Sequence, residues 1–160
     1  MRVGIGIDTH KLMDGSYLLL AGVKISSDKS IKAHSDGDIV FHSLADAIYG
    51  AVALGDIGQH FPDSDNSNKD IDSSIILSHS LNSAKEKGFI INNIDIVILL
   101  QSPKIAKYSL DMIKNISRLL ECNVDCVNIK ATTGEGLGFI GKQEGVTCHS
   151  IVSLKSSHLE

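Results

Sequence analysis

The 160-residue sequence contains no tryptophan and only seven phenylalanine and tyrosine residues together. The core must therefore be aliphatic, and the many isoleucine, leucine and valine residues can supply it. A chain of this length fits one domain that buries roughly 70% of the surface exposed by its unfolded form. We predict a single domain over residues 1–157, followed by an expression-tag remnant at His158–Leu159–Glu160.

An excess of positive charge is also missing. Lysine and arginine number 15 against 19 acidic residues, a formal net charge of −4. This balance gives no electrostatic footprint for nucleic acid, so we predict no nucleic-acid partner. An enzyme of anionic substrates would then need its positive charge concentrated in one place, and a bound metal does that efficiently.

Cysteines are few and long apolar runs are absent. Cys122, Cys126 and Cys148 are an odd number, which argues against a disulfide framework and favours a reducing cytosol. No second ligand pair stands at zinc-finger spacing from Cys122 and Cys126, so plain thiols are predicted. The apolar stretch 3–7 is too short for a signal peptide, and no run approaches the roughly 20 residues that span a bilayer. We predict a cytoplasmic protein with no membrane partner.

Strand and helix patterns alternate along the chain. Strands are predicted at 3–8, 94–100, 127–131 and 147–154, together with an extended stretch at 17–25 that Gly22 breaks, and helices at 38–54, 72–87 and 109–120. The segments 55–69 and 132–145 are predicted loops, and the run at 94–100, aliphatic apart from Asp95, is predicted as a strand buried on both faces. Asp36 or Asp38 is predicted to cap the first helix and Asp70 or Asp72 the second. The pattern predicts an α+β (α/β) sandwich, with helices packed on one face of a mixed sheet.

The strongest local signal is Asp8–Thr9–His10, directly after the first predicted strand. Residues two apart on extended backbone point to the same face, so this carboxylate and imidazole can converge on one cation. His42, in the first turn of the next helix, is suited to complete a three-ligand site of the catalytic zinc type. Each residue alone also fits a plainer role: Asp8 and His10 in a solvated loop, and His42 as a core histidine satisfied by a neighbour.

Three further segments offer groups for phosphate. His34 and the N–H groups of Ser35 and its neighbours are predicted at the positive end of the helix that bears His42. The segment 130–135 offers two hydroxyls and a carboxylate suited to Mg²⁺, or it is a flexible hairpin loop. The segment 101–104 ends a strand where ligand sites gather in open sheets, although its lysine also fits a solvated surface position.

Together these segments resemble the 2-C-methyl-D-erythritol 2,4-cyclodiphosphate synthase family of the non-mevalonate isoprenoid pathway. The resemblance runs from about residue 1 to 155. Its motifs, in order, are Gly6–Ile7–Asp8–Thr9–His10, Ala33–His34–Ser35–Asp36–Gly37–Asp38, Ala53–Leu54–Gly55–Asp56–Ile57–Gly58, Phe61–Pro62–Asp63–Ser64–Asp65, Gln101–Ser102–Pro103–Lys104 and Lys130–Ala131–Thr132–Thr133–Gly134–Glu135.

The resemblance implies a zinc-type divalent ion at Asp8, His10 and His42, and a second ion, Mg²⁺ or Mn²⁺, at Glu135. It implies that His34 and Thr133 stabilise the transition state. The other implied substrate-binding residues are Asp8, His10, Ser35 and Glu135 near the phosphates, Asp56, Ile57, Gly58, Phe61, Asp63 and Asp65 for the methylerythritol phosphate, and Leu100, Ser102, Pro103, Lys104, Ile105, Ala106, Ala131 and Thr132 for cytidine and the α-phosphate.

The resemblance also implies a bacterial, cytoplasmic homotrimer with each active site between two subunits and the sheets around a trimer axis. Its central cavity would hold an isoprenoid diphosphate, with Phe139 and Lys142 among the ligand-binding residues. This sequence has Lys142 where arginine is frequent, Gln143 where glycine is, and His149 where glutamate is. Lysine keeps the charge at that position but loses the bidentate phosphate geometry of arginine.

The implied activity is that of a metal-dependent phosphorus–oxygen lyase. The 2-phosphate of 4-diphosphocytidyl-2-C-methyl-D-erythritol 2-phosphate would attack the β-phosphorus, closing a cyclic diphosphate and releasing CMP. Two alternatives stay open on the residues alone. One is a metal-dependent phosphohydrolase that uses zinc-bound water, and the other is a trimeric metal- or nucleotide-binding module without turnover.

Overall fold

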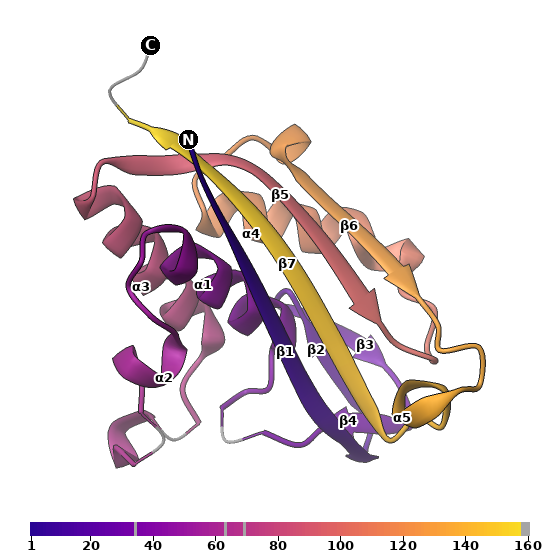
Figure 1. The fold of residues 1–160 in the computed structure, drawn as a ribbon. Coiled ribbons are helices and arrows are strands. Elements are labelled where there is room, and N and C mark those ends of the chain that lie inside the picture. The colour runs from indigo at the N-terminus through magenta and orange to yellow at the C-terminus, as the bar shows by residue number, and fades with distance from the viewer. Residues whose placement is uncertain (34, 63, 69, 158–160) are drawn as a thin grey trace.

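A five-stranded mixed sheet forms the centre of the protein (Figure 1). The computed structural model describes residues 1–33, 35–62, 64–68 and 70–157, with residue 66 described by its backbone alone. The strand order is β4-β1-β7-β5-β6, and only the β5–β6 pair is parallel among the paired strands described. The strand bounds are β1 Arg2–Asp14, β4 Lys29–Ile31, β5 Phe89–Leu99, β6 Val127–Thr132 and β7 Gly145–Ser156.

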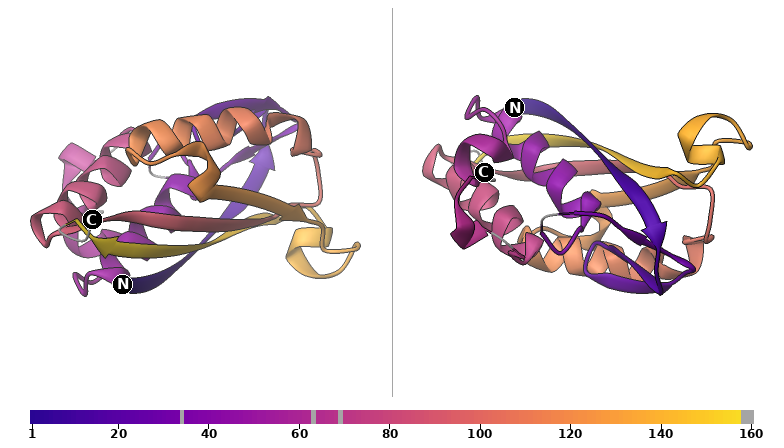
Figure 2. Two further views of the ribbon diagram at one scale, coloured as in Figure 1. Left: turned by 90° about the horizontal axis from the view of Figure 1, so that it is seen from above. Right: turned by 90° about the horizontal axis from the view of Figure 1, so that it is seen from below.

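The three longer helices lie on one face of this sheet, as predicted (Figure 2). They are α1 Ile39–Ala51, α3 Ser73–Glu86 and α4 Ser109–Leu119. A separate hairpin pairs β2 Tyr17–Leu20 with β3 Val23–Ser26. Short helical turns complete the chain: α2 Ile57–His60, η1 Asn66–Asn68, η2 Ala106–Tyr108, η3 Val124–Cys126 and α5 Gly138–Gly141.

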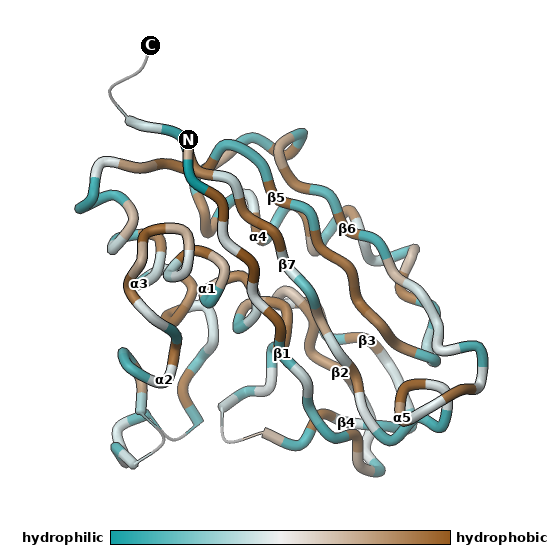
Figure 3. The backbone as a smooth tube through the Cα atoms, viewed as in Figure 1, coloured by the Kyte–Doolittle hydropathy of each residue, from teal (hydrophilic) through white to brown (hydrophobic). Residues whose placement is uncertain are grey.

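The core between helices and sheet is aliphatic, as the composition predicts. Apart from Tyr49, the largest fully buried side chains are leucine, isoleucine and one methionine. Apolar stretches run along the central strands in Figure 3, where the backbone is coloured by hydropathy. The cysteines are free thiols. Within the described ranges, no helix is both long and apolar enough to cross a bilayer.

Two glycines let α1 approach β1 closely. A Cβ at Gly4 would lie 1.9 Å from the carbonyl oxygen of Ala47, and one at Gly6 equally close to that of Ser43. Because side chains alternate along a strand, Asp8 and His10 continue this helix-facing side. The close contact that glycine allows therefore brings α1 down onto the strand face that carries the carboxylate and the imidazole.

A buried carboxylate fixes the start of α1 and ties it to the hairpin. Asp38, rather than Asp36, is the cap, and its Oδ1 accepts the N–H groups of Val40 and Phe41. The same side chain accepts the N–H groups of Ala21 at 2.9 Å and Gly22 at 2.6 Å in the β2–β3 turn. Burial raises the pKa of Asp38 to about 6, although these N–H donors oppose the shift. Asp72 caps α3, not Asp70.

Several predicted boundaries and one burial prediction were wrong. The first strand continues to Asp14, so His10 lies within it, because pairing with β7 reaches Lys11. The extended stretch predicted at 17–25 is a hairpin, and it turns at Ala21–Gly22, both at positive φ, where the break at Gly22 was predicted. The loops at 55–69 and 132–145 contain α2 and α5. The remnant predicted at 158–160 lies outside the described residues.

Strand β5 is not buried on both faces. Ile94, Ile96 and Ile98 are buried against the helices, whereas Val97 and Leu99 on the other face are only half-buried. The reason is that the helices cover one side of the sheet only. On the open side, Val3, Ile5 and Ile7 of β1 are 53–61% exposed and Ile151 of β7 is 47% exposed. An uncovered apolar sheet face of this kind marks a surface suited to a partner.

Candidate metal site and nucleotide pocket

Asp8, His10 and His42 meet at one point, as predicted. Each offers one ligand atom, and these atoms all lie within 4.8 Å of one another. Oδ2 of Asp8 is 3.0 Å from Nε2 of His10 and 3.1 Å from Nδ1 of His42. His42 is positioned by the first turn of α1, where its N–H donates to the carbonyl of Asp38 at 3.1 Å. A strand face and a helix start thus supply the three ligands.

The hydrogen bonding of His10 fits a cation between these atoms. Its Nδ1 lies 3.1 Å from the carbonyl oxygen of Lys32. A carbonyl oxygen only accepts, so Nδ1 carries the proton and Nε2 of the neutral ring presents a lone pair. That lone pair faces the carboxylate of Asp8, so an added proton or a metal ion is needed between them. The donor set of two imidazoles and a carboxylate fits a zinc-type divalent ion.

The electrostatics keep the carboxylate of this group charged. Burial raises the pKa of Asp8, but His10 and His42, which donate hydrogen bonds to it when their rings are protonated, outweigh burial and hold that pKa well below its ordinary value. The hydrogen bond to Asp8 in turn raises the pKa of His10, against the opposing effect of burial. The side chains of the three residues are 14–22% exposed. An ion held there would therefore remain accessible from outside.

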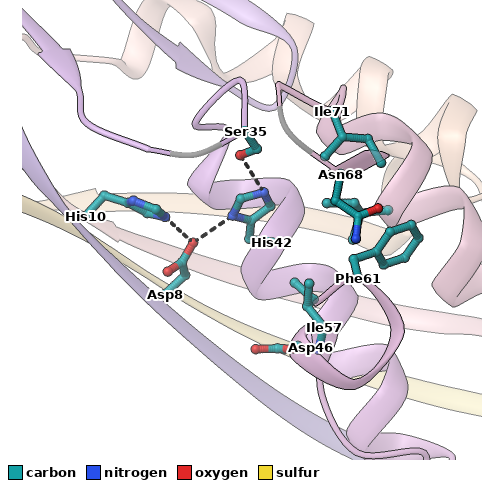
Figure 4. Close-up of a pocket in the computed structure, with 11 residues that line it drawn as sticks. Asp8, His10, Ser35, His42, Asp46, Ile57, Phe61, Asn68 and Ile71 are labelled. Carbon is teal, nitrogen blue, oxygen red and sulfur yellow. Dashed lines mark hydrogen bonds and ion pairs between the residues drawn. The ribbon is translucent and has the colours of Figure 1, made fainter. Parts of the chain in front are cut away.

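The three ligands line a cavity of about 310 Å³ (Figure 4). Ser35, Ile57, Gly58 and Phe61, all predicted substrate-binding residues, line it as well. In the close-up, Ile57 and Phe61 lie across the cavity from the Asp8 carboxylate. Further lining residues that the sequence reasoning missed are Asp46, Asn68, Ile71 and Ile76.

Asp46 ties α1, the helix that bears His42, to the segment that begins α2. Its Oδ1 accepts the N–H of Ile57 at 2.8 Å, which links α1 to the start of α2. Burial raises the pKa of Asp46, and the hydrogen bond from Ile57 opposes that shift. A sequence signal for this residue existed, because Asp46 stands one helical turn after His42 on the same helix.

A second cavity, of about 350 Å³, lies where β5 and β6 end. Its lining includes seven of the residues predicted for cytidine and the α-phosphate, together with the predicted catalytic residue Thr133; the seven are Leu100, Pro103, Lys104, Ile105, Ala106, Ala131 and Thr132. Gln101 also lines it, and its Oε1 accepts the N–H of Gly134 at 3.1 Å, which joins the two loops. Ser102 is not among the lining residues described. A pocket with apolar walls and few polar groups suits a small ligand.

Comparison with known proteins identifies the chain. The YgbB family matches residues 1–155. The chain belongs to the YgbB family. A 2-C-methyl-D-erythritol 2,4-cyclodiphosphate synthase of Chlorobium phaeovibrioides is 46% identical over 157 residues, which cover 98% of this chain and all of that protein.

Solved structures resemble this YgbB-family chain as well. The bifunctional IspDF of Campylobacter jejuni has a TM-score of 0.92 and 44% identity, covering 97% of this chain and 42% of that longer one. A Plasmodium falciparum IspF solved as a CDP complex has a TM-score of 0.87 and 35% identity, covering 98% of this chain and 97% of the other. The predicted α+β fold with a mixed sheet is therefore confirmed by the structure of the chain itself and by its similarity to these solved structures.

Four N–H groups at the start of α1 in this YgbB-family member have acceptors within the chain. The N–H groups at the start of α1 already have acceptors: Gly37 donates to Ser35 Oγ, and Asp38 donates to Asp36 Oδ1. Val40 and Phe41 donate to the capping carboxylate. An internal carboxylate thus occupies the helix start that the sequence offered to phosphate.

The remaining predicted residues are not gathered in either cavity. Asp56 caps α2 and Asp65 bonds to Ser67, and both are exposed. Glu135 accepts the hydroxyl proton of Thr133 at 2.7 Å and is not part of the Asp8 group. Phe139 and Lys142 are exposed on α5 and at its end. The predictions for His34 and Asp63 fall outside the described residues.

Proposed function

We propose that this YgbB-family chain is a 2-C-methyl-D-erythritol 2,4-cyclodiphosphate synthase. It converts 4-diphosphocytidyl-2-C-methyl-D-erythritol 2-phosphate into the cyclic 2,4-diphosphate and CMP. The observation that carries the proposal is the meeting of Asp8, His10 and His42 beside a cavity, with a separate pocket at the residues predicted for cytidine. Both parts of a nucleotide-linked substrate then have a place on the chain.

The reaction demands alignment more than acid or base catalysis. Its nucleophile is a phosphate oxygen that is already anionic, and its leaving group is the phosphate monoester CMP. Two unit charges 4 Å apart repel by about 4 kcal/mol at an effective dielectric near 20. The site must therefore hold two phosphates together and offset their repulsion. This explains a site built from ligands and donors, without a dedicated base.

The first cavity is assigned to the phosphates and the methylerythritol. Asp8, His10 and His42 would hold a zinc-type divalent ion, and such an ion supplies positive charge to phosphate oxygens when bound. The hydroxyl of Ser35, with His34, would hold the diphosphate. The walls for the methylerythritol phosphate are Asp46, Ile57, Gly58 and Phe61, joined by the predicted residues Asp56, Asp63 and Asp65.

The second cavity is assigned to cytidine and the α-phosphate. Lys104 would place a positive charge beside the α-phosphate, and the hydroxyl of Thr133 would stabilise charge in the transition state. Glu135 would hold a second divalent ion, Mg²⁺ or Mn²⁺, which would supply positive charge to the phosphates. Its carboxylate bonds to Thr133, which supports placing both in one functional unit.

We further propose a homotrimer in which each active site joins the first cavity of one subunit to the second cavity of its neighbour. Two features support this. The two cavities share no lining residue, and the sheet has an open apolar face that includes Val3, Ile5 and Ile7. Three sheets packed by that face would surround an axis. The cavity on this trimer axis would bind an isoprenoid diphosphate near Phe139 and Lys142.

The test is CMP release from the substrate, with mass spectrometry of the second product. We expect a cyclic diphosphate without uptake of ¹⁸O from labelled water, loss of turnover with a chelator and its return with Zn²⁺ or Mn²⁺. His42→Ala should lose both bound metal and CMP release. Acyclic phosphates carrying ¹⁸O would instead establish the phosphohydrolase alternative. CDP binding without turnover would establish a binding module.

A further inference from the structure

We infer that Ser73 and Asp36 are positioning residues, which fix the tautomer of His42 so that its Nδ1 faces the metal. This inference rests on the metal site of the proposed function. Neither residue is a ligand of the Asp8 group. Both act through the far nitrogen of the imidazole ring.

The contacts form a chain of three side chains from different elements. Nε2 of His42, on α1, lies 2.8 Å from Oγ of Ser73, the first residue of α3. The Ser73 hydroxyl makes a short hydrogen bond to Oδ1 of Asp36. The other carboxylate oxygen, Oδ2, accepts the Ser73 N–H at 3.1 Å. Ser73 is fully buried, so no water competes for its hydroxyl.

The direction of each proton follows from the ends of this chain. A carboxylate only accepts, so the single hydroxyl proton of Ser73 is donated to Asp36. The Ser73 oxygen then has only lone pairs to offer, and Nε2 of His42 must carry the proton that reaches it. With a metal ion between Nδ1 and Asp8, the ring is neutral and its Nδ1 is left unprotonated; without the ion, Asp8 also only accepts, so a second proton on Nδ1 takes the place of the metal. That nitrogen is the one that lies 3.1 Å from Asp8 Oδ2.

Asp36 is itself held in place. Its Oδ1 accepts the N–H of Asp38 at 3.1 Å, and its own N–H donates to the carbonyl of Ile71 at 3.3 Å. A second hydroxyl, that of Ser35, lies 3.3 Å from the same nitrogen of His42. It is the longer contact, and a hydroxyl has no fixed donor or acceptor role of its own. The pair Ser73–Asp36 therefore sets the tautomer.

Substitution of Ser73 or Asp36 should lower the metal affinity, although neither residue is a metal ligand. Partners that orient a ligating histidine are typically worth about 10- to 100-fold in metal affinity. Ser73→Ala should weaken Zn²⁺ binding by about that factor, and Asp36→Asn by less. Because Asp36 acts through the serine, the double variant should bind no more weakly than Ser73→Ala alone.

The experiment measures Zn²⁺ affinity by competition with a chromophoric chelator. Ser74→Ala is the matched control, because it is the next residue in the same helical turn and its hydroxyl makes no hydrogen bond to the described part of the chain. The control should bind as the wild type does. Long-range ¹H–¹⁵N spectra of the metal-free proteins report the tautomer directly. In the wild type Nε2 of His42 should be protonated, whatever the state of Nδ1. In Ser73→Ala, where Asp8 becomes the strongest remaining acceptor, the proton of the neutral ring should shift towards Nδ1.

The outcomes distinguish a failure of the positioning role from a failure of the proposed function. A wild type that binds no Zn²⁺ overturns the metal site and the proposed function together. Equal affinities of the wild type and Ser73→Ala overturn only the positioning role. A metal-free wild-type spectrum with no proton on Nε2 also overturns that role, and it needs no variant to fold.

Discussion

Two inactive variants should restore activity to each other if every active site joins two subunits. His42→Ala removes the metal half of the site and leaves the nucleotide pocket intact. The double variant Lys104→Ala with Thr133→Ala does the reverse. Because the two cavities share no lining residue, each change should leave the other half unaltered. Either protein alone should release almost no CMP.

The size of the rescue follows from the geometry of a ring of three. A mixed trimer with one subunit of either kind and two of the other has three junctions. At only one of them does an intact metal half face an intact nucleotide half. Mixed trimers should therefore show about one third of the wild-type rate. They are obtained by co-expressing the variants with different tags and purifying on both tags in succession.

The control pairs two variants of the same half. Mixed trimers of His42→Ala and Asp8→Ala contain no junction with an intact metal half, so they should stay inactive. A dual-tagged trimer of the first pair that remains inactive would refute the shared site. Equal rescue in both pairs would refute the assignment of the two halves. A mass other than three chains of 17.1 kDa would refute the ring.

Three further predictions test the parts that position the site. Gly6→Ala should lower the free energy of unfolding in urea by about 2 kcal/mol or more, since its Cβ would lie 1.9 Å from a carbonyl of α1. Gly50→Ala, whose nearest atom is 4.0 Å away, should raise it by about 0.5–1 kcal/mol, and equal losses would contradict the packing argument. Asp38→Ala should lower the free energy of unfolding by about 2–4 kcal/mol, because it removes a helix cap and also leaves the N–H groups of Ala21 and Gly22 unpaired. Asp72→Ala removes a cap alone and should lower it by only about 1 kcal/mol. Similar losses in the two variants would refute the role of Asp38 in joining the hairpin to α1. Removing metal should lower the thermal midpoint of the wild type but not of His42→Ala, and a fall in both would place the metal elsewhere.

The metal group could be predicted from sequence because its geometry is local. Asp8 and His10 are two residues apart on a strand, and that spacing puts them on one face wherever the strand lies. His42 needed one further assumption, that its helix start packs on that face. Gly4 and Gly6 make the assumption true, since they admit the helix backbone against the strand.

The supporting contacts could not be predicted in the same way. Ser73 reaches His42 from the first turn of a helix that begins 31 residues later, and no periodicity relates them. Asp36 was predicted as one of two caps and acts instead on Ser73. A hydrogen bond between distant segments depends on how the helices pack, which short-range patterns do not encode.

The burial of β5 failed for a different reason. Hydropathy records that a face is apolar, but it does not say whether a helix of the same chain or another copy covers it. The alternate residues of β5 and the exposed isoleucines of β1 belong to one open face. The run at 94–100 was thus correctly identified as a strand, and its predicted burial on both faces was wrong.

Strand β1 shows why packing and chemistry are linked in this protein. Its helix-facing side reads Gly4, Gly6, Asp8 and His10, so the two closest helix contacts directly precede the two metal ligands. Any change that lifts α1 from Gly6 also moves His42, which stands one residue before the serine that Gly6 contacts. A substitution at a residue that is not a candidate metal ligand can therefore still weaken metal binding. For the same reason, substitutions that disturb the packing of α1 on β1 should change the metal affinity more than they change the free energy of unfolding.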